Sequence, residues 1–347
     1  RRQLMSRKIS RSFINGRTGA GTAGQGIKVE WDSTNDGELH WMDVDESSLE
    51  YVAPYGGTSY GFVAGGDPSS NSTVVNRFSF TSDGNAGDWG DLALGNNQGS
   101  GQSSATHGYN SGGWLTSGGS TAGSNVIQKF SFSTTNTSSD VADLAHSVYV
   151  VCGGQSSSDN GYVCGGRTST EHDYIQKFNF ATEANATDIG NLIGIAQKTA
   201  GHSSSTHGWV SGGVGGGVYS DVIQKFSFSS DGDATDIANL TYTTHACAGM
   251  SSSDNGYTAG GAGSARRTNI NKFSFSSGSN ATNIGSLSSA RDAVTGSSST
   301  TYGYISGGED SGWWRNYIEK VNFSSDGSAT DVGDLTVSTG NMSGHQV

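Results

Sequence analysis

The 347-residue sequence predicts an all-β protein built from six copies of one unit. Three landmarks recur in step: a glycine pair, an Ile-Gln-Lys-Phe-Ser-Phe-like segment, and a leucine that ends an Ala-Thr-Asp-Ile-Gly-Asn-Leu-like segment. The second glycines of the pairs are 47, 53, 47, 48 and 47 residues apart, at Gly66, Gly113, Gly166, Gly213, Gly261 and Gly308. A register kept over most of the chain is typical of a repeat architecture.

Each unit is expected to contain four short strands. Apolar runs of four to seven residues alternate with Gly, Asn, Asp and Ser clusters, and no helical periodicity is sustained. In the third unit the pattern predicts strands over 154–158, 162–165, 174–180 and 188–192. The turns between them carry glycine, as at Gly161, which permits the positive φ of a tight hairpin.

A single unit cannot bury its own apolar residues. In the second unit Phe130 and Phe132 share one face of strand three, whereas Ile127 and Lys129 take the other, so both faces need cover. The first strand of each unit is nearly all Ser and Gly, which suits a crowded innermost strand around a narrow axial channel. The sequence therefore predicts a six-bladed β-propeller of four-stranded blades.

Closure of the ring is expected to involve the C-terminus. A glycine follows nine residues after each landmark leucine and opens the next innermost strand, at Gly101, Gly153, Gly201, Gly249, Gly296 and Gly344. The last of these begins a stub over 344–347, which we expect to pair beside residues 54–59 as a latch, because closure removes exposed strand edges. Two alternatives remain: continuation of the chain in a longer protein, or a seventh blade built from N-terminal strands.

The glycine pair that ends strand two, as in Gly-Tyr-Val-Cys-Gly-Gly at 161–166, and the aromatic residue of strand three resemble the repeat of kelch-type β-propellers. The resemblance covers residues 51–347. Only the first unit keeps the strand-four tryptophan, Trp89, and phenylalanine mostly replaces the kelch tyrosine. The phrase order is similar to kelch-like repeats in proteins of marine bacteriophages, especially cyanophages, and this likeness implies a protein located in the virion.

Charge is distributed unevenly along the chain. Residues 1–29 hold seven of the 19 basic residues and no acid, so 12 basic face 31 acidic residues in the remainder. The acidic body is expected to repel nucleic acid and anionic membrane surfaces, and no 18-residue apolar stretch predicts membrane insertion. We expect a basic flexible arm over 1–26, a β-hairpin over 27–50 and the propeller over 51–347.

The two N-terminal parts form the expected attachment region. The arm is rich in Gly and Ser, and its cations suit an acidic partner, another virion protein or a second copy of the chain; the alternative is a disordered tail. The hairpin turns around Asp36-Gly37, and its apolar face must pack on the propeller, on a partner or on a sister subunit. The candidate anchor residues are Arg7, Lys8, Arg11, Arg17, Trp31 and Trp41.

The sequence predicts no catalytic, metal or cofactor site, and so no enzyme. The two-histidine, two-tyrosine copper set of a kelch-type oxidase is not apparent, and Cys164 occupies a small-residue slot that predicts a buried thiol. Residues 157–161 match a sialidase Ser-x-Asp-x-Gly turn, and residues 231–236 superficially resemble a calcium loop. Both recur as turns, which favours a structural role. A kelch-type oxidase or a glycan-active enzyme is the disfavoured alternative.

A cation recurs in strand three of every unit, at Arg77, Lys129, Lys177, Lys225, Lys272 and Lys320. Six such cations could bind an anion as a ring. Pairing with strand-four aspartates such as Asp188, Asp236 and Asp331 is the favoured expectation.

The segments between strands two and three differ from unit to unit, and variable loops on a uniform scaffold are where recognition usually lies. Aromatic and polar groups there suit stacking on sugar rings or anchoring a protein. We predict a non-enzymatic virion protein, such as a fibre, decoration or adhesin subunit, that binds host surface glycan or another virion protein; a secreted lectin-like module is the alternative. The candidate ligand-binding residues are Trp114, His172, Tyr174, Tyr219, Arg266, Arg267, Trp313, Trp314, Arg315 and Tyr317.

Overall fold

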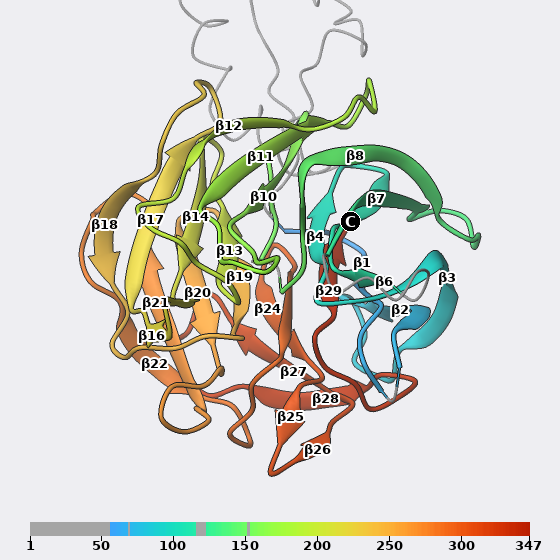
Figure 1. Ribbon diagram of the computed structural model, residues 1–347. Coiled ribbons are helices and arrows are strands. Elements are labelled where there is room, and N and C mark those ends of the chain that lie inside the picture. The colour runs from blue at the N-terminus through green and yellow to red at the C-terminus, as the bar shows by residue number, and fades with distance from the viewer. Residues whose placement is uncertain (1–55, 69, 116–122, 151–152) are drawn as a thin grey trace, which may run out of the picture. The chain divides into compact units, whose positions relative to one another are not determined.

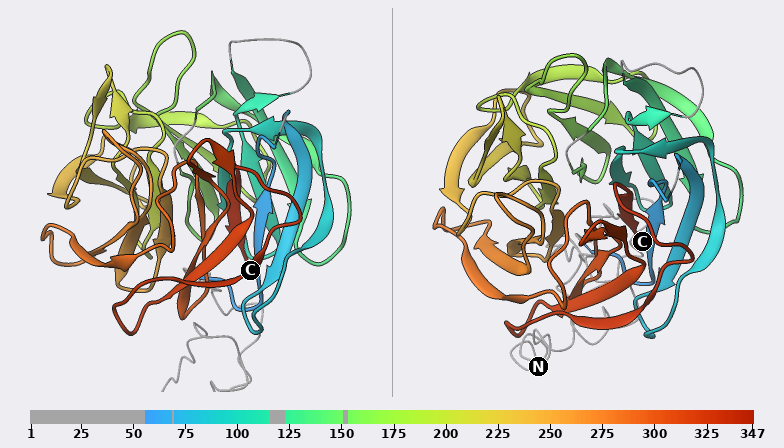
Figure 2. Two further views of the ribbon diagram at one scale, coloured as in Figure 1. Left: turned by 90° about the horizontal axis from the view of Figure 1, so that it is seen from below. Right: turned by 60° about the horizontal axis from the view of Figure 1, so that its bottom comes forward.

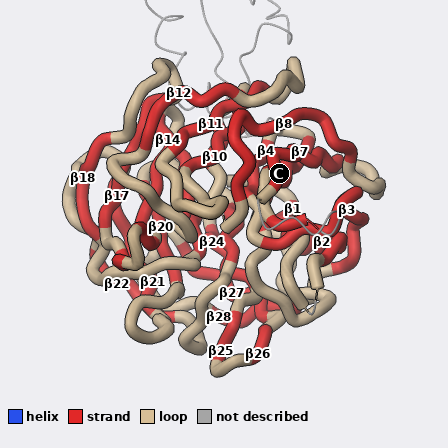
Figure 3. The backbone as a smooth tube through the Cα atoms, in the orientation of Figure 1, coloured by secondary structure: helices blue, strands red, loops and turns tan. Residues whose placement is uncertain are grey.

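The computed structural model describes residues 56–68, 70–115, 123–150 and 153–347. Within these ranges every regular element is a β-strand, and Figure 3 shows strands and loops without a helix. The strands form six antiparallel sheets of four strands, one extended by a short fifth, that follow one another around a central axis (Figures 1 and 2). The predicted six-bladed β-propeller is therefore confirmed. The arm at 1–26, the hairpin at 27–50 and the anchor residues lie outside the described residues.

Each blade runs from strand one at the axis to strand four at the rim. Blade one consists of β29 (Ser343–Gln346), β1 (Tyr60–Ala64), β2 (Ser72–Ser79) and β3 (Gly87–Asn97), and blade two of β4 (Ser100–Ser103), β5 (His107–Ser111), β7 (Ser124–Ser131) and β8 (Ser139–Val148). Blade three consists of β9 (Gln155–Ser156), β10 (Asn160–Cys164), β11 (Tyr174–Asn179) and β12 (Thr187–Asn191), and blade four of β13 (Ala200–Ser203), β14 (His207–Ser211), β17 (Val222–Ser227) and β18 (Thr235–Asn239). Blade five consists of β19 (Ala248–Ser251), β20 (Asn255–Ala259), β21 (Asn269–Ser274) and β22 (Thr282–Ser286), and blade six of β23 (Thr295–Ser298), β24 (Tyr302–Ser306), β27 (Tyr317–Asn322) and β28 (Thr330–Asp334). The strands of the third blade begin and end within two residues of the positions that the sequence predicts.

Three short additions lie outside the six sheets of four. Strand β6 (Trp114–Leu115) pairs with the end of β3. The hairpins β15 (Val214–Gly215) with β16 (Val218–Tyr219), and β25 (Glu309–Asp310) with β26 (Trp313–Trp314), lie between strands two and three of blades four and six. These additions use the variable segments of the sequence and leave the repeated sheets unchanged.

The C-terminal stub closes the ring as strand one of the first blade. Strand β29 pairs antiparallel with β1, from Gly61 opposite Gln346 to Ala64 opposite Ser343, near the centre of the ring (Figure 1). The latch is confirmed, but its partner strand begins after residues 54–59. Gly57 pairs with Ser299 of blade six and also lies against Val347 of the stub, and Ser59 donates its N–H to the Val347 carbonyl oxygen at 2.8 Å.

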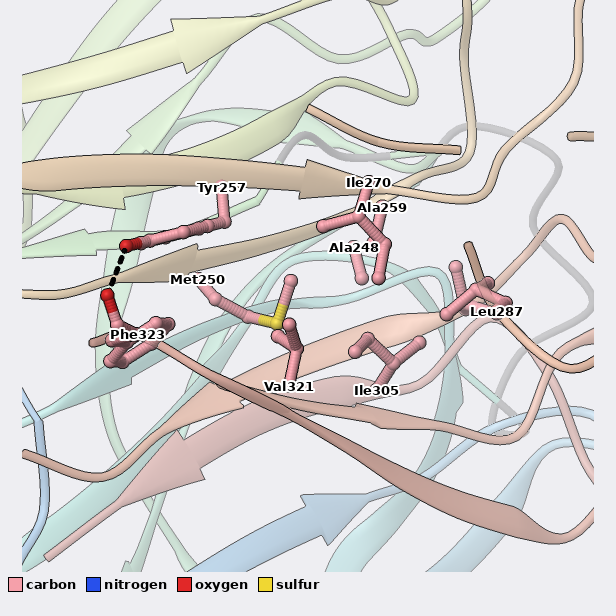
Figure 4. Packing of buried hydrophobic residues seen from close by; sticks show 10 residues of the cluster. Ala248, Met250, Tyr257, Ala259, Ile270, Leu287, Ile305, Val321 and Phe323 are labelled. Atoms are coloured by element: carbon pink, nitrogen blue, oxygen red, sulfur yellow. Dashed lines mark hydrogen bonds between the residues drawn. The ribbon is translucent and has the colours of Figure 1, made fainter. Parts of the chain in front are cut away.

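The core consists of six apolar clusters, each shared by two neighbouring blades. Figure 4 shows the cluster between blades five and six, where Met250 lies close to Val321 and Ile305. The Tyr257 hydroxyl donates to the Phe323 carbonyl oxygen at 3.4 Å across this boundary. Burial between blades confirms that one unit cannot shield both of its own faces.

One aromatic contact is repeated around the whole ring. An aromatic residue of strand two packs on the second phenylalanine position of strand three in the next blade, with ring centroids 4.6 to 5.2 Å apart. The pairs are Phe62 with Phe132, Tyr109 with Phe180, Tyr162 with Phe228, Trp209 with Phe275, Tyr257 with Phe323, and Tyr304 with Phe80. The last pair joins the sixth blade to the first, so aromatic stacking closes the ring together with the latch.

The Ser-rich innermost strands form a closed belt of hydrogen bonds around the axis. The backbone N–H of one residue per strand donates to a side-chain oxygen of the next blade, at 2.9 to 3.4 Å. In ring order these residues are Ser103, Ser156, Ser203, Ser251, Ser298 and Gln346, whose own N–H returns to Ser103. The glycines of these strands leave room for the backbone of the neighbouring blade. The serine hydroxyls accept hydrogen bonds from backbone N–H groups on the axial edge of each sheet, where no further strand is present to accept them.

Candidate functional site

The segments between strands two and three lie at the same end of the propeller as the crossovers from strand four to the next blade, because strands two and four of a blade run in the same direction. A backbone hydrogen bond that recurs in every blade joins these two sets of segments. In each blade the second glycine donates its N–H to a crossover carbonyl oxygen at 2.7 to 2.9 Å, from Gly66 to Asn96, Gly113 to Val148, Gly166 to Ala196, Gly213 to Thr244, Gly261 to Arg291 and Gly308 to Thr339.

We call this end the loop face. Its described residues are 65–68, 70–71, 112–115, 123, 165–173, 212–221, 260–268 and 307–316, together with the crossovers 93–99, 145–150, 153–154, 193–199, 241–247, 288–294 and 336–342.

The described residues expose seven large hydrophobic side chains, and all seven lie on the loop face. They are Trp114, Ile193, Ile195, Val218, Tyr219, Trp313 and Val337. The opposite end, formed by the turns from strand one to two and from three to four, exposes none among the described residues. Such one-sided exposure distinguishes the loop face as the candidate binding surface, because scattered apolar exposure would favour neither end.

Among the described residues, blade six carries the most exposed aromatic side chain. Trp313, in hairpin β25–β26, is 71% exposed. Its neighbour Trp314 lies against the backbone of Gly340, where an added Cβ would overlap the indole ring. Arg315 lies 3.4 Å from an Asp310 oxygen, and its guanidinium is 6.0 Å from the Tyr317 ring centroid. Trp313 is thus free to contact a ligand, and the other predicted residues of this cluster support the hairpin.

In blade three, two of the predicted ligand-binding residues, His172 and Tyr174, stack on each other. The Tyr174 ring lies between the rings of His146 and His172, at centroid distances of 4.1 and 4.8 Å. The His172 Nε2 is 2.8 Å from the Thr168 hydroxyl. Both faces of Tyr174 are therefore covered, and only ring edges remain for a ligand.

Four of the seven exposed hydrophobic side chains lie on the crossover from blade three to blade four and on the blade-four hairpin: Ile193, Ile195, Val218 and Tyr219. The crossover and the hairpin that carry them pair at Gln197 opposite Val214. Glu171 holds both elements, accepting from the Gly216 N–H and the Gln197 Nε2 at 2.6 Å each. Sequence reasoning found only Tyr219 here. The signal for the crossover residues is Ile193 directly after the landmark leucine, where the other five units carry Ala, Ser or Thr.

Tyr219 stacks face to face on His245 at a centroid distance of 4.9 Å. The His245 Nδ1 is 2.7 Å from the Ala262 carbonyl oxygen, so this nitrogen donates. Burial lowers the pKa of His245. The ring is consequently neutral near pH 7 and serves as a platform for Tyr219.

The remaining predicted residues are also engaged within the protein. Trp114 packs edge-on against Tyr149 at 5.4 Å. Arg266 pairs with Asp292 at 2.7 Å and with Glu309. Arg267 lies over the Tyr242 ring, 5.2 Å from its centroid. All ten predicted residues lie on or directly beside the loop face, but they are distributed over five blades and do not converge on one pocket.

The strand-three cations do not pair as expected. Four of them bind a carboxylate in the turn between strands three and four of the next blade: Lys129 with Glu183, Lys177 with Asp231, Lys272 with Asp326, and Lys320 with Asp83. The prediction of partners such as Asp188, Asp236 and Asp331 is wrong, because the lysine side chain crosses the blade boundary. Arg77 and Lys225 face blades without a turn carboxylate and lie over Trp89 and Trp209, at 3.7 and 5.1 Å.

The calcium-like loop and the buried thiol have structural roles. Asp231 pairs with Lys177, and Asp233 Oδ1 accepts the Asn191 N–H at 2.8 Å, so both carboxylates join blade four to blade three. Cys164 is fully buried, as its small-residue slot predicts, and its thiol lies 3.1 Å from Gln155 Oε1. Among the described residues no group of three or more His, Cys, Asp or Glu side chains is placed to hold a metal ion.

No known protein-family model matches the sequence, and no curated protein matches it significantly. The described part of the chain contains no helix long and apolar enough to cross a membrane. The propeller itself, with its apolar groups on one face, suits a binding or structural module.

Proposed function

We propose that this chain is a non-enzymatic binding protein of a phage virion, such as a fibre, decoration or adhesin subunit, whose loop face contacts host surface glycan or another virion protein. The observation that carries the binding role is the confinement of every exposed large hydrophobic side chain among the described residues to the loop face. The virion setting rests on the likeness of the repeats to those of marine phage proteins.

The chemistry of the loop face suits a sugar or protein ligand. Trp313 stands 71% exposed on a hairpin that the Asp310–Arg315 contact and the packing of Trp314 against Gly340 hold in place, and an indole has only two side-chain torsions to fix on stacking. Ile193, Ile195, Val218 and Tyr219 are further exposed apolar side chains on the same face. Aromatic anchors surrounded by polar groups are typical of carbohydrate and protein recognition.

Attachment to the particle is assigned to the N-terminal region. Its seven cations and no acid in residues 1–29 contrast with the acidic remainder of the chain, so an acidic virion surface would attract the arm in preference to the propeller. The candidate residues are those named from the sequence. Deleting residues 1–50 should release the propeller from particles while leaving its fold and its ligand binding intact.

Two measurements separate this proposal from its alternatives. Mass spectrometry of purified particles should find the chain in stoichiometric amount, and its absence would contradict the virion role. Binding of the purified chain to a glycan array and to particle proteins tests the loop face. Glycan binding without presence in particles would indicate a secreted lectin-like module, and turnover of a sugar substrate would indicate an enzyme.

Point variants test the face directly. Trp313→Ala and Tyr219→Ala should each weaken binding, while the melting temperature stays unchanged because these side chains are exposed. Lys225→Gln, on the outer strands away from the loop face, is the matched control and should bind as the unmodified protein does. Equal binding by all of these variants would exclude both aromatic residues as contacts.

A further inference from the structure

The axial channel opens on the loop face as a small cavity of about 110 Å³. Its wall is formed by residues of the innermost strands, among them Gly201 and Gly249, and by two or three residues from each crossover. At these glycines an added Cβ would overlap backbone atoms of the neighbouring blade. The cavity is therefore a fixed feature of the ring, and side chains of the strands do not fill it.

The charge of this cavity is opposite to that of the protein. The whole chain carries a formal net charge of −12, yet the described residues of the cavity wall include no carboxylate. Among these residues Lys198 alone is positively charged. Among the described residues no carboxylate lies within ion-pair distance of Lys198. A lysine on a cavity wall without a counter-ion attracts an anion.

Several loop-face carboxylates that could serve as counter-ions are engaged elsewhere. Glu171 accepts from the Gly216 N–H and from Gln197, and Asp310 pairs with Arg315. Asp292 and Glu309 both bind Arg266. Three of these four carboxylates are paired with arginines, and none of the four forms an ion pair with Lys198.

Thr199, next to Lys198, supplies an unused donor. The residue is 4% exposed and is one of those that line the cavity, and its buried hydroxyl has no hydrogen-bond partner. Its methyl group faces Gly213, where an added Cβ would overlap it, so the hydroxyl takes another direction. A buried hydroxyl without a partner costs free energy, which a bound acceptor would recover.

The backbone of the innermost strands adds donors of the same kind. The N–H groups of Ser203 and Ser251 point away from strand two, because they bond to hydroxyls of the neighbouring blade. Alternation along a strand places the N–H groups of Gly201 and Gly249, two residues earlier, on the same axial edge. Both glycines line the cavity.

We propose that the axial cavity binds a small oxyanion, held by the Lys198 ammonium and the Thr199 hydroxyl. A carboxylate and a sulfate or phosphate group share this chemistry, as charged acceptors of several hydrogen bonds. The site is separate from the exposed aromatic residues of the loop face. It depends neither on the virion setting nor on glycan stacking at Trp313.

The test uses sodium acetate and sodium sulfate as probes, titrated into the full-length chain at constant ionic strength with chloride as the balancing ion. Calorimetry and thermal shift should show saturable binding of at least one probe. Acetate alone would assign a carboxylate, sulfate alone a tetrahedral oxyanion, and both the shared chemistry. Lys198→Gln should weaken binding by about tenfold or more.

Two further variants keep the test decisive. Lys225→Gln also removes a lysine that lacks a carboxylate partner, but one away from the cavity, and should bind the probe normally. Thr199→Val should weaken binding without lowering the melting temperature in chloride, since it deletes a hydroxyl that has no partner. Equal affinity in the unmodified protein and in Lys198→Gln, or shifts without saturation, would overturn the proposal.

Chemical shifts of His245 give an independent readout. The Lys198 charge contributes to the lowered pKa of His245, after the larger effect of burial. A bound anion would offset that charge, so the pKa of His245 should rise on addition of the probe. The pKa should not respond in Lys198→Gln, and a response there would place the anion elsewhere.

Discussion

Arg291 donates to Glu319 at the boundary between blades five and six, and both side chains are fully buried. Arg291 also donates to the Gly307 carbonyl oxygen at 2.9 Å, and Glu319 accepts the Ser288 N–H at 2.8 Å. The guanidinium lies 5.1 Å from the Tyr317 ring centroid. The pair therefore links a crossover of blade five to strands two and three of blade six.

The other five boundaries place neutral residues at the same two positions. The crossover residue and its strand-three neighbour are Asn96 with Gln128, Val148 with Gln176, Ala196 with Gln224, Thr244 with Asn271, and Thr339 with Asn76. In each case the strand-three amide oxygen accepts a crossover N–H, as Glu319 does. The backbone bond thus needs no charge, and the ion pair is an addition at one boundary.

We predict that Arg291→Thr alone lowers the free energy of unfolding by about 3–5 kcal/mol, because it leaves the Glu319 carboxylate buried without its cation. The double variant Arg291→Thr with Glu319→Asn copies the neutral pair Thr244 and Asn271 and should recover most of that loss. Denaturant unfolding of both variants measures the effect. A single variant as stable as the unmodified protein would show that water reaches Glu319.

The arrangement of blades could be predicted from the sequence because each landmark has one structural cause. The glycine pair, as at Gly165 and Gly166, adopts positive φ after strand two, and the strand-three aromatics pack between blades. The number of landmarks fixes the number of blades. The final Gly344 predicts the latch, since it repeats the glycine that opens every other innermost strand.

The partners of the strand-three lysines could not be predicted, because the sequence does not say which blade a long side chain reaches. Lys177 could pair within its own blade or across the boundary, and both choices place an aspartate within reach of its side chain. Only the stagger of neighbouring blades sets Asp231 beside it, at 2.5 Å. Arg77 and Lys225 form no such ion pair, because the turn of the next blade, which supplies the partner elsewhere, carries no carboxylate there.

We expect these exposed pairs to contribute little stability. Lys177 and Asp231 are 27% and 57% exposed, and pairs of this kind are worth about 1 kcal/mol or less. A double-mutant cycle with Lys177→Met and Asp231→Asn should give a coupling energy in this range that declines with added salt. Lys225→Met, which removes a lysine without a carboxylate partner, shows the effect of losing the side chain alone. A coupling above about 2 kcal/mol would contradict the prediction.

The placement of the candidate site on one end of the ring was predictable, but the exposure of its side chains was not. Strand direction sends every two-to-three segment to the loop face, which the sequence pattern reveals. Whether Tyr174 points outward or lies between His146 and His172 depends on a crossover distant in sequence. Ile193 and Ile195 were missed because they belong to the crossovers, which carry no obvious variable insertion.

The ring of axial glycines should tolerate no side chain. An added Cβ at Gly344 would overlap the Gly296 carbonyl oxygen, and both atoms belong to backbone that the ring holds in place. We expect Gly344→Ala to lower the free energy of unfolding by about 2–3 kcal/mol. Gly327→Ala is the matched control, because nothing lies within 4 Å of its added Cβ; it should stay within about 0.5 kcal/mol of the unmodified protein. Equal stability of the two variants would show that the latch strand can shift outward.

Two histidines of the innermost strands make the fold sensitive to acid. His202 and His345 are fully buried, and burial lowers the pKa of each to about 4. Their Nδ1 atoms face the Met250 and Gln102 carbonyl oxygens at 3.1 and 3.0 Å, so each ring is neutral and donates from Nδ1. The unfolded chain takes up these protons below about pH 6.5 and the native protein does not, so stability should fall as the pH drops from 6.5 toward 4.

The expected loss between pH 7 and pH 5 is about 2 kcal/mol per histidine. Glutamine occupies the equivalent place at Gln102 and Gln155 and donates to the next blade from its amide, so His202→Gln with His345→Gln should fold. Guanidinium unfolding of both proteins at the two pH values separates the histidines from the carboxylates, whose titration is common to both. The double variant should lose about 4 kcal/mol less than the unmodified protein. An identical loss would mean that acid sensitivity arises elsewhere, because glutamine cannot take up a proton in this range.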